Sequence, residues 1–102
     1  MSHNLPAQCQ NKDELRVEID RIDQALITLF AERQTYVTRM AEIKTEIKEA
    51  YDPKRIEAVI AKVRQRAAAL DLDQDQAELL WRTLIGWNIE YEKNIITARQ
   101  KT

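Results

Sequence analysis

The residues of this chain that could do chemistry are the charged and amide side chains that interrupt otherwise apolar helical patterns. Arg33 stands at a position where the pattern calls for a buried, apolar residue. A guanidinium that faces a core is costly unless an anion meets it. Lys44 follows eleven residues later, close to three helical turns, so both side chains should point the same way, about 16 Å apart along the axis. The pair favours a site that binds an anion.

Four more residues could belong to such a site. Arg16 precedes Arg33 by seventeen residues, about 25 Å along a helix, so the two could share a ligand only if a second copy packed antiparallel. Arg55, in the first turn of a second helix, could fold back toward the same region or simply be an exposed residue of that turn. Asn88 and Glu92 form an i, i+4 polar pair within an apolar pattern.

Each of the other five candidate residues also has a simpler interpretation. Arg33 could extend to the surface or pair with a carboxylate such as Glu92. Lys44 and Arg16, taken singly, are more often solvated charges. Asn88 and Glu92 would form a surface patch if the phase of their helix were shifted by one residue. Composition and periodicity therefore predict an all-helical dimer with a possible anion pocket, and no more than that.

The composition argues against several other chemistries. The only histidine, His3, and the only cysteine, Cys9, lie in a polar N-terminal stretch, so a histidine acid–base site, a cysteine nucleophile or a zinc cluster is not expected. With 1 glycine in the chain there is no Gly-rich phosphate loop. The 16 basic and 17 acidic residues give a net charge of −1, which offers no basic surface for nucleic acid or membranes. We expect a cytoplasmic protein with neither metal nor cofactor.

Three helices are expected to position these side chains. Apart from Arg33, one apolar seam predicts a single helix from Asp13 to about Glu49, capped by Asn11 or Asp13. The seam consists of Leu15, Ile19, Ile22, Leu26, Leu29, Tyr36, Met40, Ile43 and Ile47. Such a helix would be about 55 Å long, more than the diameter of a small globule. We therefore expect part of the seam to lie against another chain.

The second helix should begin at Asp52-Pro53, with the aspartate as N-cap and the proline in the first turn, and run to about Leu70. Its expected buried stripe is Ile56, Val59, Ile60, Val63 and Ala67.

Asp73 and Gln76 form a capping-box pattern for the third helix, which should continue to about Ala98. Its expected apolar positions are Ala77, Leu80, Trp81, Leu84, Ile85, Trp87, Ile89 and Ile95. Gly86 within this helix suggests close approach of another helix or a ligand. Residues 1–12 are expected to form a flexible tail, and residues 13–102 a single all-α domain.

Several short motifs resemble those of the all-helical chorismate mutases, a fold that also includes the isochorismate pyruvate lyases. They are Leu15-Arg16, Ile19-Asp20-Arg21-Ile22-Asp23, Leu29-Phe30-Ala31-Glu32-Arg33, Ile43-Lys44 and Tyr51-Asp52-Pro53-Lys54-Arg55, and the resemblance covers about residues 13 to 95. It implies an intertwined homodimer with two active sites that needs no cofactor. It also implies an isomerase of aromatic amino acid biosynthesis, in the shikimate pathway, which converts chorismate to prephenate.

The resemblance also implies catalytic roles for three residues. Arg33 would bind a substrate carboxylate, Lys44 would contact the ether oxygen and a carboxylate, and Glu92 would hydrogen-bond the ether oxygen. These roles suit a pericyclic rearrangement, which requires a dicarboxylate held in its compact conformer and stabilisation of the charge that builds on the ether oxygen. Arginine provides planar, bidentate contacts to carboxylates.

Four further positions are implied as substrate-binding. Arg16 would reach across the dimer into the partner's site. Asp52 and Arg55 would lie at the start of the second helix, beside the ring hydroxyl and a carboxylate. Asn88 would line the pocket.

Two alternatives to a chorismate mutase stay open. Ile56 stands where many chorismate mutases have a glutamate, and it and the Ile85-Gly86-Trp87 stretch are more like the lyase, which makes salicylate and pyruvate from isochorismate. Glu92 and Asp52 are, in turn, less like that lyase. A third interpretation is a non-catalytic helical dimerisation or regulatory module, in which Arg16, Arg33 and Lys44 bind no ligand.

Overall fold

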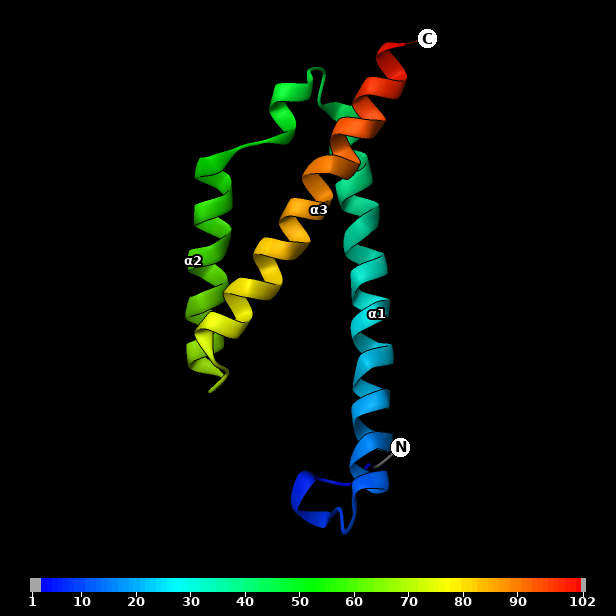
Figure 1. Cartoon of the computed structure of the whole chain (residues 1–102), viewed down its shortest axis with the longest axis vertical. Coiled ribbons are helices and arrows are strands. Elements are labelled where there is room, and N and C mark those ends of the chain that lie inside the picture. The colour runs from blue at the N-terminus through cyan, green and yellow to red at the C-terminus, as the bar shows by residue number, and fades with distance from the viewer. Residues whose placement is uncertain (1–2, 102) are drawn as a thin grey trace. The chain divides into compact units, whose positions relative to one another are not determined.

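The computed structural model describes residues 3–101, and all regular secondary structure in that range is helical, which confirms the predicted all-α class. The elements in chain order are η1 (Pro6–Gln8), α1 (Lys12–Ile43), η2 (Ile47–Ala50), α2 (Pro53–Ala69) and α3 (Gln74–Gln100), where η denotes a short 3₁₀ helix (Figure 1). Within residues 3–101, no helix combines the length and the apolar character that crossing a membrane requires.

The chain divides into two compact units, residues 1–36 and 37–102. The described part of the first unit holds η1 and most of α1. The Asn11 side-chain oxygen accepts a hydrogen bond from the Glu14 amide at 2.9 Å, so Asn11, one of the two predicted residues, caps α1. The Glu14 carboxylate in turn accepts from the Gln10 amide at 2.8 Å.

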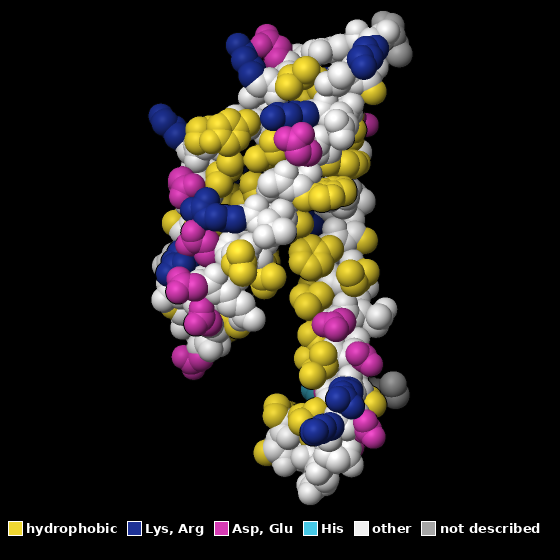
Figure 2. Space-filling model, viewed as in Figure 1, with side chains coloured by type: hydrophobic (Ala, Val, Ile, Leu, Met, Phe, Trp, Pro, Cys, Tyr) yellow, Lys and Arg dark blue, Asp and Glu magenta, His cyan; other side chains and the backbone are white. Residues whose placement is uncertain are grey.

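The apolar seam of α1 is exposed within the single chain. Ala41 is the one residue of α1 that is buried. Hydrophobic side chains are visible at the surface along this helix in the space-filling view (Figure 2). The exposed seam residues include Leu15, Ile19, Ile22, Leu26, Leu29, Tyr36, Met40 and Ile43. One copy of the chain therefore does not bury this seam.

The prediction that the first helix runs to about Glu49 is wrong, because α1 ends at Ile43 and a separate 3₁₀ turn, η2, follows. The Glu49 carboxylate accepts hydrogen bonds from the backbone amides of Thr45 and Glu46 at 2.7 and 2.8 Å. These amides would donate to helix carbonyls if α1 continued, so Glu49 stabilises the break. Arg99 of α3 also donates to carbonyls in the last turn of α1.

In the second unit, α2 and α3 pack against each other beyond a tight turn (Figure 1). Asp71 has a φ of 57°, and the Leu72 amide donates to the Ala67 carbonyl at 2.9 Å, which is the Schellman pattern of a helix end. Asp73 then caps α3 by accepting from the Gln76 amide at 2.9 Å. The buried apolar residues of this unit are Ala41, Ala50, Ile60, Ala67, Ala77 and Ile96.

Most predicted features of α2 and α3 are confirmed. Asp52 caps α2 with Pro53 in the first turn, and the predicted stripe of α2 is buried or half-buried. Two of the expected apolar positions of α3, Leu80 and Trp87, are exposed in the single chain. The buried residues of α3 are instead Ala77, Asn88, Glu92 and Ile96, so two of the four are polar.

Candidate functional site

The centre of the candidate site is an ion pair between Lys44 and Glu92. Lys44 immediately follows the end of α1, and Glu92 lies in the second half of α3. The ammonium Nζ is 3.2 Å from Oε1 and 3.3 Å from Oε2 of the carboxylate. The two side chains are only 21% and 9% exposed. Removing either partner of such a shielded pair would leave an uncompensated charge.

Asn88 lies one turn before Glu92 and on the same face of α3. It is 6% exposed, and neither Oδ1 nor Nδ2 of its amide has a hydrogen-bond partner among the described residues. Buried polar groups are normally hydrogen-bonded, so an unpaired amide calls for an explanation. Burial rules out the surface-patch interpretation of Asn88 and Glu92. Their shared face fits contact with a polar ligand.

One polar contact near this ion pair could not be predicted from sequence patterns. The Thr38 hydroxyl lies 2.7 Å from the Tyr91 hydroxyl, so the last part of α1 is hydrogen-bonded to α3 one residue before Glu92. Tyr91 also stacks on Trp87, with ring centroids 5.4 Å apart. These contacts help to fix the part of α3 that carries the ion pair.

Asp52 and Arg55 lie at the start of α2, and both are exposed. One carboxylate oxygen of Asp52 accepts from the Arg55 backbone amide at 3.1 Å, so this oxygen serves as the helix cap. Within residues 37–101, no hydrogen bond or ion pair joins either side chain to Lys44 or Glu92. The structure thus brings together Lys44, Glu92 and the face carrying Asn88, and joins neither Asp52 nor Arg55 to them by such a bond.

The other two predicted arginines belong to the first unit. Arg33 is half-buried, and its Nη1 is buried without a hydrogen-bond partner among residues 3–101. Arg16 is exposed and forms an i, i+3 ion pair with Asp13 at 3.4 Å. A surface pair of this kind contributes little free energy.

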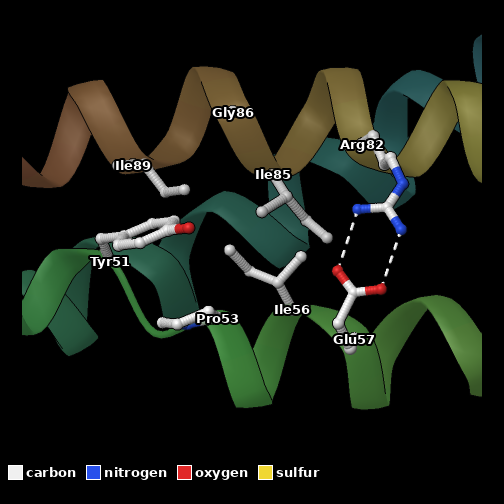
Figure 3. A pocket seen from close by; sticks show the side chains of 8 residues that line it. All are labelled: Tyr51, Pro53, Ile56, Glu57, Arg82, Ile85, Gly86 and Ile89. Atoms are coloured by element: carbon white, nitrogen blue, oxygen red, sulfur yellow. Dashed lines mark hydrogen bonds and ion pairs between the residues drawn. The ribbon is translucent and has the colours of Figure 1, made fainter.

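A pocket of about 210 Å³ opens between the start of α2 and the middle of α3. Figure 3 shows the Arg82 guanidinium in a bidentate contact with Glu57, and Ile56 and Ile85 pointing toward each other beside it. Ile56, the residue type that is more like the lyase at this position, therefore lines this pocket. The lining consists of Tyr51, Pro53, Ile56, Glu57, Arg82, Ile85, Gly86 and Ile89.

Gly86 has open space beside it within the described chain. A Cβ built at this position would meet no atom of the described chain within 4 Å. No other helix within residues 3–101 therefore approaches Gly86 closely, and approach by a ligand or by a second chain stays a prediction. Gly86 instead borders the pocket.

The Arg82 guanidinium connects the two helices that form the pocket. It contacts Glu57 at 2.9 and 3.1 Å and Glu78 at 2.7 Å. Hydrogen bonding to Arg82 lowers the pKa of both carboxyl groups below their ordinary value. No group of three or more His, Cys, Asp and Glu side chains within residues 3–101 is arranged to hold a metal ion.

The sequence of this chain matches a known class of enzymes. The sequence model of the family described as chorismate mutase type II matches residues 15–93. A chorismate mutase of Methanocaldococcus jannaschii is 27% identical over 88 residues, which cover 85% of this chain and 89% of that protein. The chain belongs to the chorismate mutase type II family.

Proposed function

We propose that this protein is an isomerase that rearranges chorismate to prephenate. The observation that carries the proposal is the shielded Lys44–Glu92 pair, with the unpaired Asn88 amide on the same face of α3. The rearrangement is intramolecular and needs no nucleophile, so charge placement and conformational control supply the catalysis. This site offers those two resources. Membership of the chorismate mutase type II family supports the same reaction.

Lys44 and Glu92 act on the breaking ether bond in this proposal. Negative charge builds on the ether oxygen in the transition state, and the Lys44 ammonium stabilises it electrostatically. A carboxyl group can donate a hydrogen bond to the same oxygen only when it is protonated. In the ligand-free chain Glu92 accepts from Lys44, so it must gain a proton before it can donate.

Arginines hold the two substrate carboxylates in this proposal. The unpaired, buried Nη1 of Arg33 supports a carboxylate-binding role for that residue. Arg55 takes the second carboxylate, Asp52 the ring hydroxyl, and Asn88 contacts the bound substrate from the same face of α3 as Glu92.

Arg16 completes the site from the second subunit of a homodimer. Its exposed guanidinium and the exposed apolar seam of α1 both support this arrangement. We also place the protein in the cytoplasm, because its single cysteine offers no disulfide within the chain.

The deciding experiment incubates the purified protein separately with chorismate and isochorismate and identifies the products by chromatography. Prephenate from chorismate supports the proposal, and Lys44→Ala should abolish most of its formation. Salicylate and pyruvate from isochorismate alone would make the protein a lyase. Ile56, which stands where many chorismate mutases have a glutamate, is the residue that favours that second candidate.

The same assay tests the non-catalytic alternative. If neither substrate is converted, and a variant with Arg16, Arg33 and Lys44 all changed to Ala loses no ligand affinity, the proposed enzyme activity is wrong.

A further inference from the structure

The carbonyls at the end of α1 are capped from α3. The last carbonyls of a helix lack intrahelical donors and need partners from elsewhere. Arg99 Nη1 donates to the carbonyls of Ala41 and Glu42 at 3.0 and 3.2 Å, and Arg99 Nη2 donates to the carbonyl of Lys44. One guanidinium therefore serves three backbone acceptors at the point where α1 stops.

Lys44 is consequently held at three atoms. Its backbone amide donates to the Met40 carbonyl at 3.0 Å, its carbonyl accepts from Arg99, and its ammonium contacts Glu92. Two of these three contacts come from α3. Because Lys44 lies outside α1, no continuing helix fixes its own carbonyl, and Arg99 restrains that carbonyl while Glu49 holds the amides of the next two residues.

Glu92 and Arg99 are seven residues apart on α3, which places them two turns apart on the same face, about 10 Å along the axis. The same helical face therefore fixes Lys44 by its backbone and by its ammonium. Gln100, next to Arg99, adds a hydrogen bond to the Thr45 carbonyl at 3.1 Å.

We propose that Arg99 is a positioning residue: it fixes the backbone at the end of α1 so that the Lys44 ammonium stays at Glu92. The inference rests on the proposed function, because the value of a fixed Lys44 lies in its catalytic role. Arginine suits this task because its planar guanidinium carries five donors in a rigid fork, whereas lysine offers a point charge. A cation at this helix end is also favoured by the helix dipole.

The test measures kcat and KM for chorismate in Arg99→Gln, in Lys44→Ala and in the double variant. We expect Arg99→Gln to lower kcat by about tenfold to a hundredfold, the scale of an ångström of misplacement, with KM changed much less. In the Lys44→Ala background the same change should cost less than about twofold, because the group that Arg99 positions is gone. An equal loss in both backgrounds would overturn the inference.

Two matched variants complete the design. Arg39→Gln removes an exposed arginine of α1 whose ion pair is the local one to Glu42, and it should leave kcat unchanged. Arg99→Lys keeps the positive charge but loses the fork, so it should give an intermediate kcat. If Arg99→Gln does not fold, Arg99→Lys carries the test, and wild-type kcat in that variant would overturn the inference.

Amide hydrogen exchange separates this inference from the proposed function because it needs no substrate. We expect the amides of residues 44–46 to exchange faster in Arg99→Gln than in wild type, while those of α2 keep their rates. Unchanged exchange at residues 44–46 would overturn the inference about Arg99 even if the enzyme is active. A wild-type protein that converts no chorismate would overturn the proposed function. The exchange pattern would still test whether Arg99 fixes the backbone at the end of α1.

Discussion

Lys44 is the residue on which the proposed chemistry depends most. We expect Lys44→Ala to lower kcat on the order of 10²-fold or more, because losing one preorganised donor at a developing oxyanion has that effect. Steady-state kinetics with chorismate measures it. Lys48→Ala is the matched control, since Lys48 lies in the same connection, is 82% exposed and pairs with Glu46. Near-normal turnover in Lys44→Ala would remove Lys44 from the site.

Glu92 should make the reaction depend on pH. The proposed hydrogen bond to the ether oxygen requires the protonated carboxyl group, so activity should fall as the pH rises. The amide of Glu92→Gln donates at any pH, and this variant should therefore show a flatter profile. Measuring kcat/KM across the pH range for both proteins gives the comparison. A wild-type rate that does not change with pH would contradict the assigned role.

At the scale of helices, the Arg82 network should stabilise the packing of α2 on α3 in a pH-dependent way. Because the folded-state pKa of Glu57 and Glu78 lies below the ordinary 4.5, their contribution is complete above that value and is lost as the pH falls through the lowered pKa. Urea unfolding between about pH 6 and pH 3 should show this loss, and Arg82→Gln should show a smaller one. Equal acid sensitivity in both proteins would exclude the network as its source.

Helix boundaries could be predicted from sequence where local residues decide them. Asp52, Asp73 and Asn11 cap the amides three residues ahead of them, so short-range patterns were enough. The end of α1 could not be predicted in this way. It depends partly on Arg99, which lies more than fifty residues away in the chain, and on the Glu49 side chain turning back on Thr45 and Glu46.

The candidate site was predictable only where the local sequence pattern identifies a residue. The pattern identified Asn88 and Glu92 as polar residues in an apolar helix, and the structure shows that both are buried. It did not indicate that Thr38 would meet Tyr91, nor that Arg82 would pair with Glu57, because polar residues outside the apolar pattern are common and their partners depend on how the helices pack. Leu80 and Trp87 follow the apolar pattern of α3 yet are exposed in the single chain, because a helical period alone does not define which apolar positions one chain buries.

For the whole molecule, the exposed seam of α1 supports a homodimer in which Arg16 crosses between subunits. Arg16→Ala and Lys44→Ala should each be nearly inactive alone. Mixed dimers would contain one intact site, in which the subunit with Lys44 receives Arg16 from its partner. Unfolding and refolding the two variants together should therefore restore about a quarter of wild-type activity, since half of the dimers are mixed and half of their sites are intact.

The control for this mixing experiment is each variant refolded alone, which should stay inactive. If Arg16 acted within its own subunit, every site in a mixed dimer would lack one of the two residues. If dimers are present by ultracentrifugation and no activity is recovered, the result would contradict a role for Arg16 in the partner's site.

The unpaired Asn88 amide implies a trade-off between stability and function. A buried polar group without a partner costs about 1–3 kcal/mol, so the ligand-free protein is less stable than its fold would permit. We expect Asn88→Leu, a substitution of similar size, to keep or raise the free energy of unfolding while lowering kcat/KM at least tenfold. Thermal unfolding and kinetics on the same sample measure both quantities. Lower stability with full activity would mean that Asn88 serves the fold, whereas the expected result would mean that the protein gives up stability to keep a substrate contact.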